Sequence, residues 1–141
     1  MARRSKYASR MSVHDLLASV RAWRQPERVT RVTAEELGLE RLPPLALLLQ
    51  FSSIGSRSCR DALNRLAEAA ARTDGRVSVL ELSLRRHSAL QARLGVRFTP
   101  SVYVVAADGA VVGHWARPPE RDELEQALAD LAARQPTPVT V

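Results

Sequence analysis

Residues 45–60 read LALLLQFSSIGSRSCR and pass from an apolar run through a polar turn into the start of a helix. The run at 45–49 is apolar at every position, which is typical of a strand buried on both faces of a sheet. A second strand is predicted at 77–82, after the helix. Strand, helix and strand in this order predict a right-handed crossover between parallel neighbours. The predicted inner face of the helix consists of Cys59, Ala62, Leu63, Leu66, Ala67 and Ala70.

The opposite face of this helix carries charges at a spacing of four residues. Asp61 precedes Arg65, and Glu68 precedes Arg72. Opposite charges at this spacing meet on a helix surface. The sequence therefore predicts two ion pairs along the helix.

The rest of the chain supplies the remaining elements of an α/β fold. Thr33 caps a short helix before the first strand, and residues 28–32 are a candidate edge strand. After a short helix that ends near Gly95, a strand at 101–105 turns at Asp108-Gly109, which is a hairpin signal, into an antiparallel strand at 111–115. A last helix follows, and its predicted inner face consists of Leu124, Ala127, Leu128 and Leu131.

Over residues 45–133, this order of elements and the turn from Ser56 to Cys59 resemble the thioredoxin family. Residues 48–60 are most similar to actinobacterial-type thioredoxin-like proteins, in which a Phe-Ser-Ser segment precedes Cys-x-x-Cys-Arg. The resemblance implies a mixed central sheet flanked by helices. It also implies that residues 96–101 are the cis-proline segment of the family.

The chain departs from the family at the residues that carry out redox chemistry. Ser56 stands at the position of the attacking cysteine, so only the resolving position, Cys59, keeps its sulfur. The other departures are Gln50 at the buried acid, Ser52 and Gly55 at the two tryptophans, Arg57-Ser58 at Gly-Pro, and Ser83 at an aspartate. Because a dithiol cycle needs an attacking and a resolving thiol, we expect none here.

Cys59 and Ser56 are the candidate catalytic residues, and each has two interpretations. Cys59 lies in the first turn of a helix, where the macrodipole favours a thiolate, but it also falls on the apolar face, where a buried thiol packs like an apolar side chain. Ser56 is either an N-cap or a hydroxyl at the attacking position. A serine here fits natural loss of the thiol or an engineered replacement of a cysteine.

The resemblance assigns peptide binding to the loop at Thr99 and Pro100. In the family, the main chain before the cis-proline pairs with an extended substrate segment, which needs no redox chemistry. We therefore expect a protein without dithiol cycling that binds an extended peptide or a partner protein. The binding residues would be Ser56, Cys59, Thr99 and Pro100, with Arg57 and Ser58 beside them. The alternative is a monothiol thiol-disulfide oxidoreductase or redox sensor that uses Cys59.

Charge divides the chain into a basic arm and a neutral domain. Residues 1–31 contain eight basic and two acidic residues, whereas residues 32–141 contain thirteen of each, so the net charge of +6 lies in the arm. The predicted domains are the arm at 1–31, a thioredoxin-like domain at 32–134 and a tail at 135–141. Polyanion contact through residues 3–31 is therefore a third expectation.

Within the arm, residues 12–24 carry apolar side chains on one helical face. Such an amphipathic helix can pack on the domain or on a second copy of the chain, lie on an anionic membrane, act as a transit segment, or contact nucleic acid or a partner protein. A homo-oligomer through this helix is one expected outcome.

The numbers of cysteine and histidine residues limit which disulfides and metal sites the chain can form. A single cysteine allows no intrachain disulfide, which favours a reducing, cytoplasmic location. No apolar run reaches the length of a membrane span. Three isolated histidines and one cysteine form no ligand cluster, and no glycine-rich phosphate loop occurs, so neither a metal nor a cofactor is expected.

Overall fold

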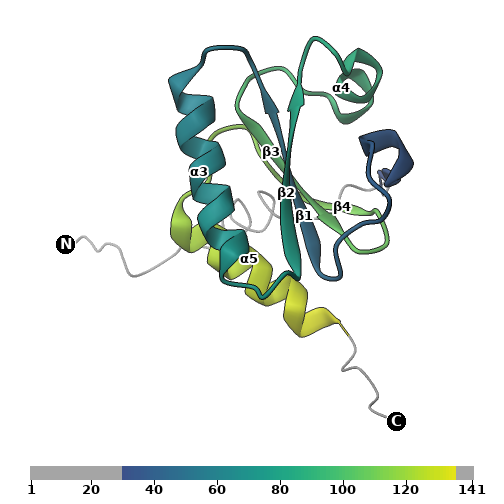
Figure 1. Ribbon diagram of the computed structural model, residues 1–141, viewed down its shortest axis with the longest axis vertical. Helices are drawn as coiled ribbons and strands as arrows, with labels where there is room; N and C mark the ends of the chain where they lie inside the picture. The colour runs from purple at the N-terminus through teal and green to yellow at the C-terminus, as the bar shows by residue number, and fades with distance from the viewer. Residues whose placement is uncertain (1–29, 136–141) are drawn as a thin grey trace, which may run out of the picture.

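The apolar run near residue 45 forms strand β1 (Ala46–Ser52), and every residue of this strand is buried. The computed structural model describes residues 30–135 (Figure 1). The other elements, in chain order, are η1 (Glu35–Leu37), α3 (Arg57–Ala71), β2 (Val77–Ser83), α4 (Ser88–Leu94), β3 (Ser101–Ala106), β4 (Val111–Trp115) and α5 (Arg121–Arg134). The predicted order of strands and helices from 45 onward is confirmed.

The four strands form one mixed sheet in the order β2-β1-β3-β4. Strands β1 and β2 are parallel, and β3 is antiparallel to both β1 and β4. The ends of β1 and β2 therefore meet the beginning of β3 at one edge of the sheet. In this register Ser52 lies beside Ser83, and Phe51 lies opposite Ser101. Polar residues from three strands are thus brought to the same edge.

Helices cover both faces of the sheet, and alternate residues of β1 pack into the core on one face or the other. Helices α3 and α5 lie together on one face, whereas α4 lies on the other (Figure 1). Leu48 packs with residues of α3 and α5, and Leu49 packs with residues of η1 and α4. Because side chains alternate along a strand, Gln50 is directed to the α3 side, as Leu48 is. Gln50 therefore lies in the layer that contains Cys59.

The buried face of α3 differs slightly from the prediction. Cys59, Ala62 and Leu66 are buried as expected, but Ala67 is exposed and Ala69 is buried in its place. Helix α5 packs against this part of α3 and determines which side is covered. All four predicted inner residues of α5 are buried.

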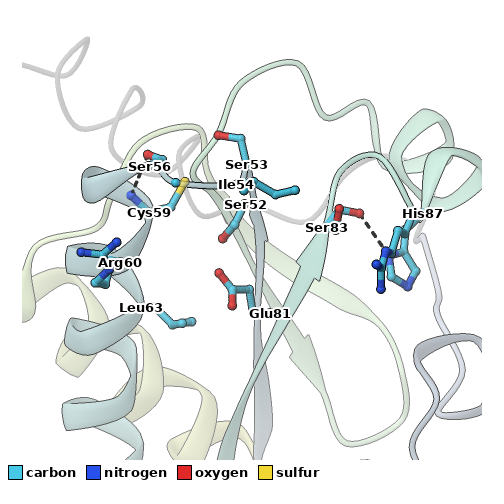
Figure 2. Close-up of a pocket in the computed structure, with 12 residues that line it drawn as sticks. Ser52, Ser53, Ile54, Ser56, Cys59, Arg60, Leu63, Glu81, Ser83 and His87 are labelled. Carbon is cyan, nitrogen blue, oxygen red and sulfur yellow. Dashed lines mark hydrogen bonds between the residues drawn. The ribbon is translucent and has the colours of Figure 1, made fainter.

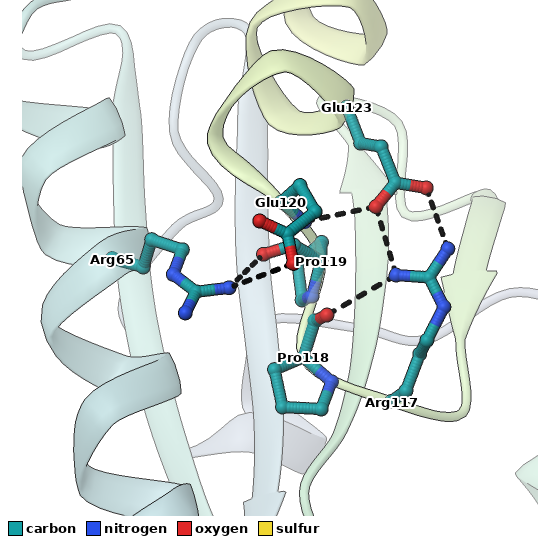
Figure 3. Close-up of polar contacts among 6 residues, drawn as sticks. All are labelled: Arg65, Arg117, Pro118, Pro119, Glu120 and Glu123. Atoms are coloured by element: carbon teal, nitrogen blue, oxygen red, sulfur yellow. Dashed lines mark hydrogen bonds and ion pairs between the residues drawn. The ribbon is translucent and has the colours of Figure 1, made fainter.

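The two predicted ion pairs along α3 do not form. Arg65 instead donates a 2.8 Å hydrogen bond to the carbonyl oxygen of Pro119 and lies 3.8 Å from Glu120 (Figure 3). Arg72 pairs with Glu125 of α5 at 3.2 Å. Because α5 supplies acceptors alongside α3, both arginines turn toward the neighbouring helix.

The segment at residues 31–32 is held against the turn between β3 and β4 by main-chain contacts. Arg31 forms an isolated antiparallel bridge with Ala110, and the Val32 amide donates a 2.9 Å hydrogen bond to the Gly109 carbonyl. Only this end of the candidate edge strand at 28–32 lies within the described residues. The predicted helix at 12–24 and the proposed oligomer contact lie outside them. Between residues 30 and 135, no helix is long and apolar enough to cross a membrane.

Candidate functional site

Ser56 is the N-cap of α3, as one of its two interpretations predicted. Its backbone is extended, and its Oγ accepts a 3.2 Å hydrogen bond from the Cys59 amide. Gly55, at a φ of +78°, supplies the left-handed turn that leads into the cap. The hydroxyl of Ser56 thus satisfies one of the free amides of the first helical turn.

Cys59 is buried in the first turn of α3, with an exposed fraction of 2%. Burial raises the pKa of its thiol. Hydrogen bonding lowers this pKa and outweighs burial, so that the pKa is lower than usual. The hydrogen-bonding groups are the Ser56 hydroxyl, the Ser53 main chain and the hydroxyls of Ser52 and Ser53. A lower pKa gives a larger fraction of thiolate at neutral pH. Cys59 therefore packs in the core, and its thiol is more acidic than that of an ordinary cysteine.

Gln50 lies against the main chain of Cys59 and is fully buried. Its Nε2 donates hydrogen bonds of 3.0 Å to Ser52 Oγ and 2.7 Å to the Cys59 carbonyl oxygen. Its Oε1 has no hydrogen-bond partner among the described residues. The amide connects the end of β1 to the first turn of α3, and it cannot act as a proton-accepting carboxylate would.

The bond between Thr99 and Pro100 is cis, as the resemblance implied. Thr99 Oγ1 and Ser53 Oγ lie 2.9 Å apart in a hydrogen bond. The proline loop is therefore joined to the segment just before the Ser56 turn. Pro100 is buried and Thr99 is half-buried. Among residues 30–135, no hydrogen bond uses the main-chain amide or carbonyl of Thr99.

A pocket of about 490 Å³ opens beside Cys59, between α3 and the end of β2 (Figure 2). Its lining consists of Ser52, Ser53, Ile54, Gly55, Ser56, Cys59, Arg60, Leu63, Glu81, Ser83, Arg86 and His87. Of the predicted site residues, only Ser56 and Cys59 line it. Thr99 and Pro100 are not among the lining residues, although Thr99 is hydrogen-bonded to Ser53, which is one of them. Arg57 and Ser58 are exposed on the first turn of α3. The predicted site residues therefore do not all line this pocket.

Several pocket residues were not predicted from the sequence. Glu81 is on the same side of β2 as Ser83, and Arg86 and His87 follow β2 in the loop before α4. His87 lines the same pocket as Ser56. However, His87 Nδ1 donates to the Ser83 carbonyl at 3.1 Å, and no hydrogen bond joins it to Ser56. The signal available in the sequence was the predicted parallel pairing of the strands at 45–49 and 77–82, which brings the residues after both strands to one end of the sheet.

The proline loop is flanked by two exposed apolar side chains. Ile54 is 86% exposed and Phe98 is 67% exposed, and these are the exposed large hydrophobic residues of the described chain. They come from the two segments that the Ser53–Thr99 hydrogen bond joins. Isolated exposed apolar residues are common, but these two come from loops that are joined by a hydrogen bond.

The described residues offer no metal site: no group of three or more histidine, cysteine, aspartate or glutamate side chains lies close enough to hold an ion. The residues that line the pocket include no phosphate-binding glycine loop. The chemistry available at the site is therefore that of one thiol, several hydroxyls and a few charged side chains.

Comparison with known proteins identifies the fold. The sequence matches no protein-family model and no curated protein. Chloroplastic thioredoxin z is similar in structure, with a TM-score of 0.57 and 16% identity over 77% of this chain and 98% of that one. Thioredoxin-2, a component of the malaria parasite protein secretion machinery, has a TM-score of 0.54 and 12% identity over 61% and 82%. The germline-specific thioredoxin Deadhead of Drosophila melanogaster has a TM-score of 0.53 and 17% identity over 62% and 82%. The chain is a thioredoxin-fold protein with a single cysteine.

Proposed function

We propose that this protein binds an extended segment of a partner protein and does not carry out dithiol redox cycling. The binding surface would run between the Ser53-Ile54 segment and residues 98–100. Cys59 and Ser56 would lie beside the bound segment, and Arg57 and Ser58 would be within reach on the first turn of α3.

The observation that carries this proposal is the free main chain of Thr99. Its amide and carbonyl have no partner among residues 30–135, although the residue is held by the side-chain bond to Ser53. An extended peptide can pair with such groups as an added strand does. Ile54 and Phe98 would cover apolar side chains of the bound segment on either side. These interactions require no thiol.

The number of thiols supports binding over catalysis. Cys59 is the one cysteine of the chain, and Ser56 at the attacking position is engaged as the N-cap. Reduction of a substrate disulfide would therefore stop at a mixed disulfide, because no second thiol in the chain can resolve it. The chain should consequently not turn over as a disulfide reductase.

The test is peptide binding by Phe98→Ser, measured by fluorescence anisotropy with labelled peptides selected from a random library on the unaltered protein. Loss of an apolar contact of this size should weaken binding by about tenfold. Cys59→Ala should bind as the unaltered protein does, and Ala89→Ser, an exposed position on α4, serves as the matched surface control. Equal binding by Phe98→Ser and Ala89→Ser would refute the proposal, as would loss of binding in Cys59→Ala alone.

A second candidate is a monothiol protein that forms mixed disulfides through Cys59. It is favoured by the lowered pKa of this thiol and by the pocket that opens onto it. Purification of the native protein with and without an alkylating quench separates the two candidates. A partner bound through Cys59 depends on the thiol, whereas a partner in the peptide groove does not.

A further inference from the structure

We propose that the segment bound by this protein is acidic, with apolar residues flanked by aspartate or glutamate. This inference rests on the proposed function and names the chemistry of the partner. It concerns the binding surface between the Ser53-Ile54 segment and residues 98–100, and it requires no thiol. Three observations support it.

The first observation is that positive charge gathers at the end of the sheet where this surface lies. Residues 53–60 follow β1, residues 84–88 follow β2, and residues 95–100 precede β3, so the strand pairing brings all three segments to one end (Figure 1). Together they contain five arginines and no aspartate or glutamate. The rest of residues 32–141 contains eight basic and thirteen acidic residues. The domain is neutral as a whole, but its positive charge is concentrated beside the proposed surface.

The second observation is that the arginines of these three segments are available to a ligand. All five are exposed, and none forms an ion pair or a side-chain hydrogen bond with a residue between 30 and 135. Six of the nine other arginines in this range form ion pairs. The five unpaired arginines are Arg57, Arg60, Arg85, Arg86 and Arg97.

These guanidinium groups flank the exposed apolar side chains. Arg97 directly precedes Phe98 in the chain, and Arg60 and Arg86 line the same pocket as Ile54 (Figure 2). Glu81 also lines this pocket, but it forms no ion pair with a described residue. A guanidinium group binds a carboxylate through two parallel hydrogen bonds. Carboxylates on either side of an apolar residue would therefore be complementary to this surface.

The third observation favours a polypeptide over a nucleic acid, which has the same sign of charge. The amide and carbonyl of Thr99 are free to pair with an extended main chain. Of the two exposed large apolar side chains, only Phe98 is aromatic, whereas single-stranded nucleic acids stack successive bases on aromatic side chains. The basic arm at 1–31 has the same charge as the five arginines, so it is not a complementary occupant.

The experiment selects peptides from a random library on the full chain and on two double variants. Arg57→Gln/Arg97→Gln removes two charges beside the proposed surface. Arg76→Gln/Arg134→Gln is the matched control, because it removes two exposed, unpaired arginines that lie outside the three segments, and both variants keep the arm. We expect the unaltered protein and the control to select peptides enriched in aspartate and glutamate, and Arg57→Gln/Arg97→Gln to lose this enrichment.

One selected peptide is then labelled, and its affinity is measured by fluorescence anisotropy. Arg57→Gln/Arg97→Gln should weaken its binding about threefold to tenfold, which is the scale of two exposed charge contacts, and the control should not. Replacing the acidic residues of the peptide with their amides should have a similar effect. Raising the salt concentration should reduce the difference between the two variants.

The inference is overturned if the selected peptides show no acidic enrichment, if the two double variants bind the labelled peptide alike, or if a single-stranded oligonucleotide displaces it as well as unlabelled peptide does. Self-association that is lost only in Arg57→Gln/Arg97→Gln would also overturn it, because a second copy would then occupy the surface. Phe98→Ser separates the two proposals. Unchanged binding by this variant refutes the binding surface itself, whereas weaker binding of peptides without acidic enrichment refutes only the present inference.

Discussion

The Ser52 hydroxyl contacts Gln50 and helps to lower the pKa of the Cys59 thiol. Its oxygen accepts the hydrogen bond from Gln50 Nε2, so its own hydrogen is available for the sulfur of Cys59. An amide at position 50 thus orders a hydroxyl that favours the thiolate. The acidity of this thiol therefore depends on hydrogen bonding and does not require a buried carboxylate.

Replacing Ser52 with alanine should raise the pKa of the Cys59 thiol, because one hydrogen bond to the thiolate is removed. The thiolate absorbance should then appear at higher pH, and alkylation at neutral pH should slow about threefold to fivefold. Ser78→Ala, at an exposed position on β2, is the control. An unchanged titration in Ser52→Ala would show that this hydroxyl does not act on the sulfur.

Contacts between elements hold the domain together at two further places. At the start of α5, Glu123 accepts a 2.8 Å hydrogen bond from the Glu120 amide and two from Arg117, each 2.8 Å long (Figure 3). This capping box fixes where α5 begins, and Arg65 joins the same region to α3. On the other face of the sheet, a different pair connects η1 to α4.

That pair, Glu36 and Arg93, is expected to make stability depend on pH. Hydrogen bonding from Arg93, followed by the Thr33 amide, lowers the pKa of Glu36 to about 2 from 4.5. The unfolded chain therefore binds more protons between these values, so the contribution is complete above about 4.5 and is lost as the pH falls toward 2. Because both side chains are partly exposed, its size at neutral pH is about 1 kcal/mol or less.

Glu36→Gln removes the charge and keeps an acceptor for the Thr33 amide. Its free energy of unfolding, measured with urea, should be lower than that of the unaltered protein by about 1 kcal/mol at pH 7, and the difference should disappear near pH 2. Glu35→Gln, a neighbouring glutamate without a described ion pair, should show no such pH dependence. A deficit for Glu36→Gln that persists at low pH would contradict the assignment to charge.

For the whole molecule, the charge distribution predicts that the arm and the domain bind different partners. Deletion of residues 1–28 removes seven basic and two acidic residues and keeps the bridge between Arg31 and Ala110. We expect the shortened chain to lose most of its salt-sensitive retention on a heparin column, because little net charge remains. Its thermal unfolding should still be cooperative.

The same variant tests self-association through residues 12–24. If the arm forms the contact between copies, sedimentation should show a smaller assembly after its removal. Identical retention and identical sedimentation for the full and shortened chains would exclude both roles of the arm.

The sequence by itself determined the order of elements, because buried strands and amphipathic helices carry periodic apolar patterns that are local in the chain. It also determined the absence of a dithiol pair, which follows from one cysteine. The N-cap at Ser56 and the inner face of α5 were predictable for the same local reason.

Only the tertiary structure decided which side chains share a site. The register of β1 and β2 brings Glu81 to the layer of Gln50, and the loop after β2 carries Arg86 and His87 to the pocket at Cys59. Helix α5 turned Arg65 and Arg72 away from their expected partners on α3. These outcomes depend on contacts between residues far apart in sequence, because the partner of a side chain is whichever group the tertiary packing places next to it.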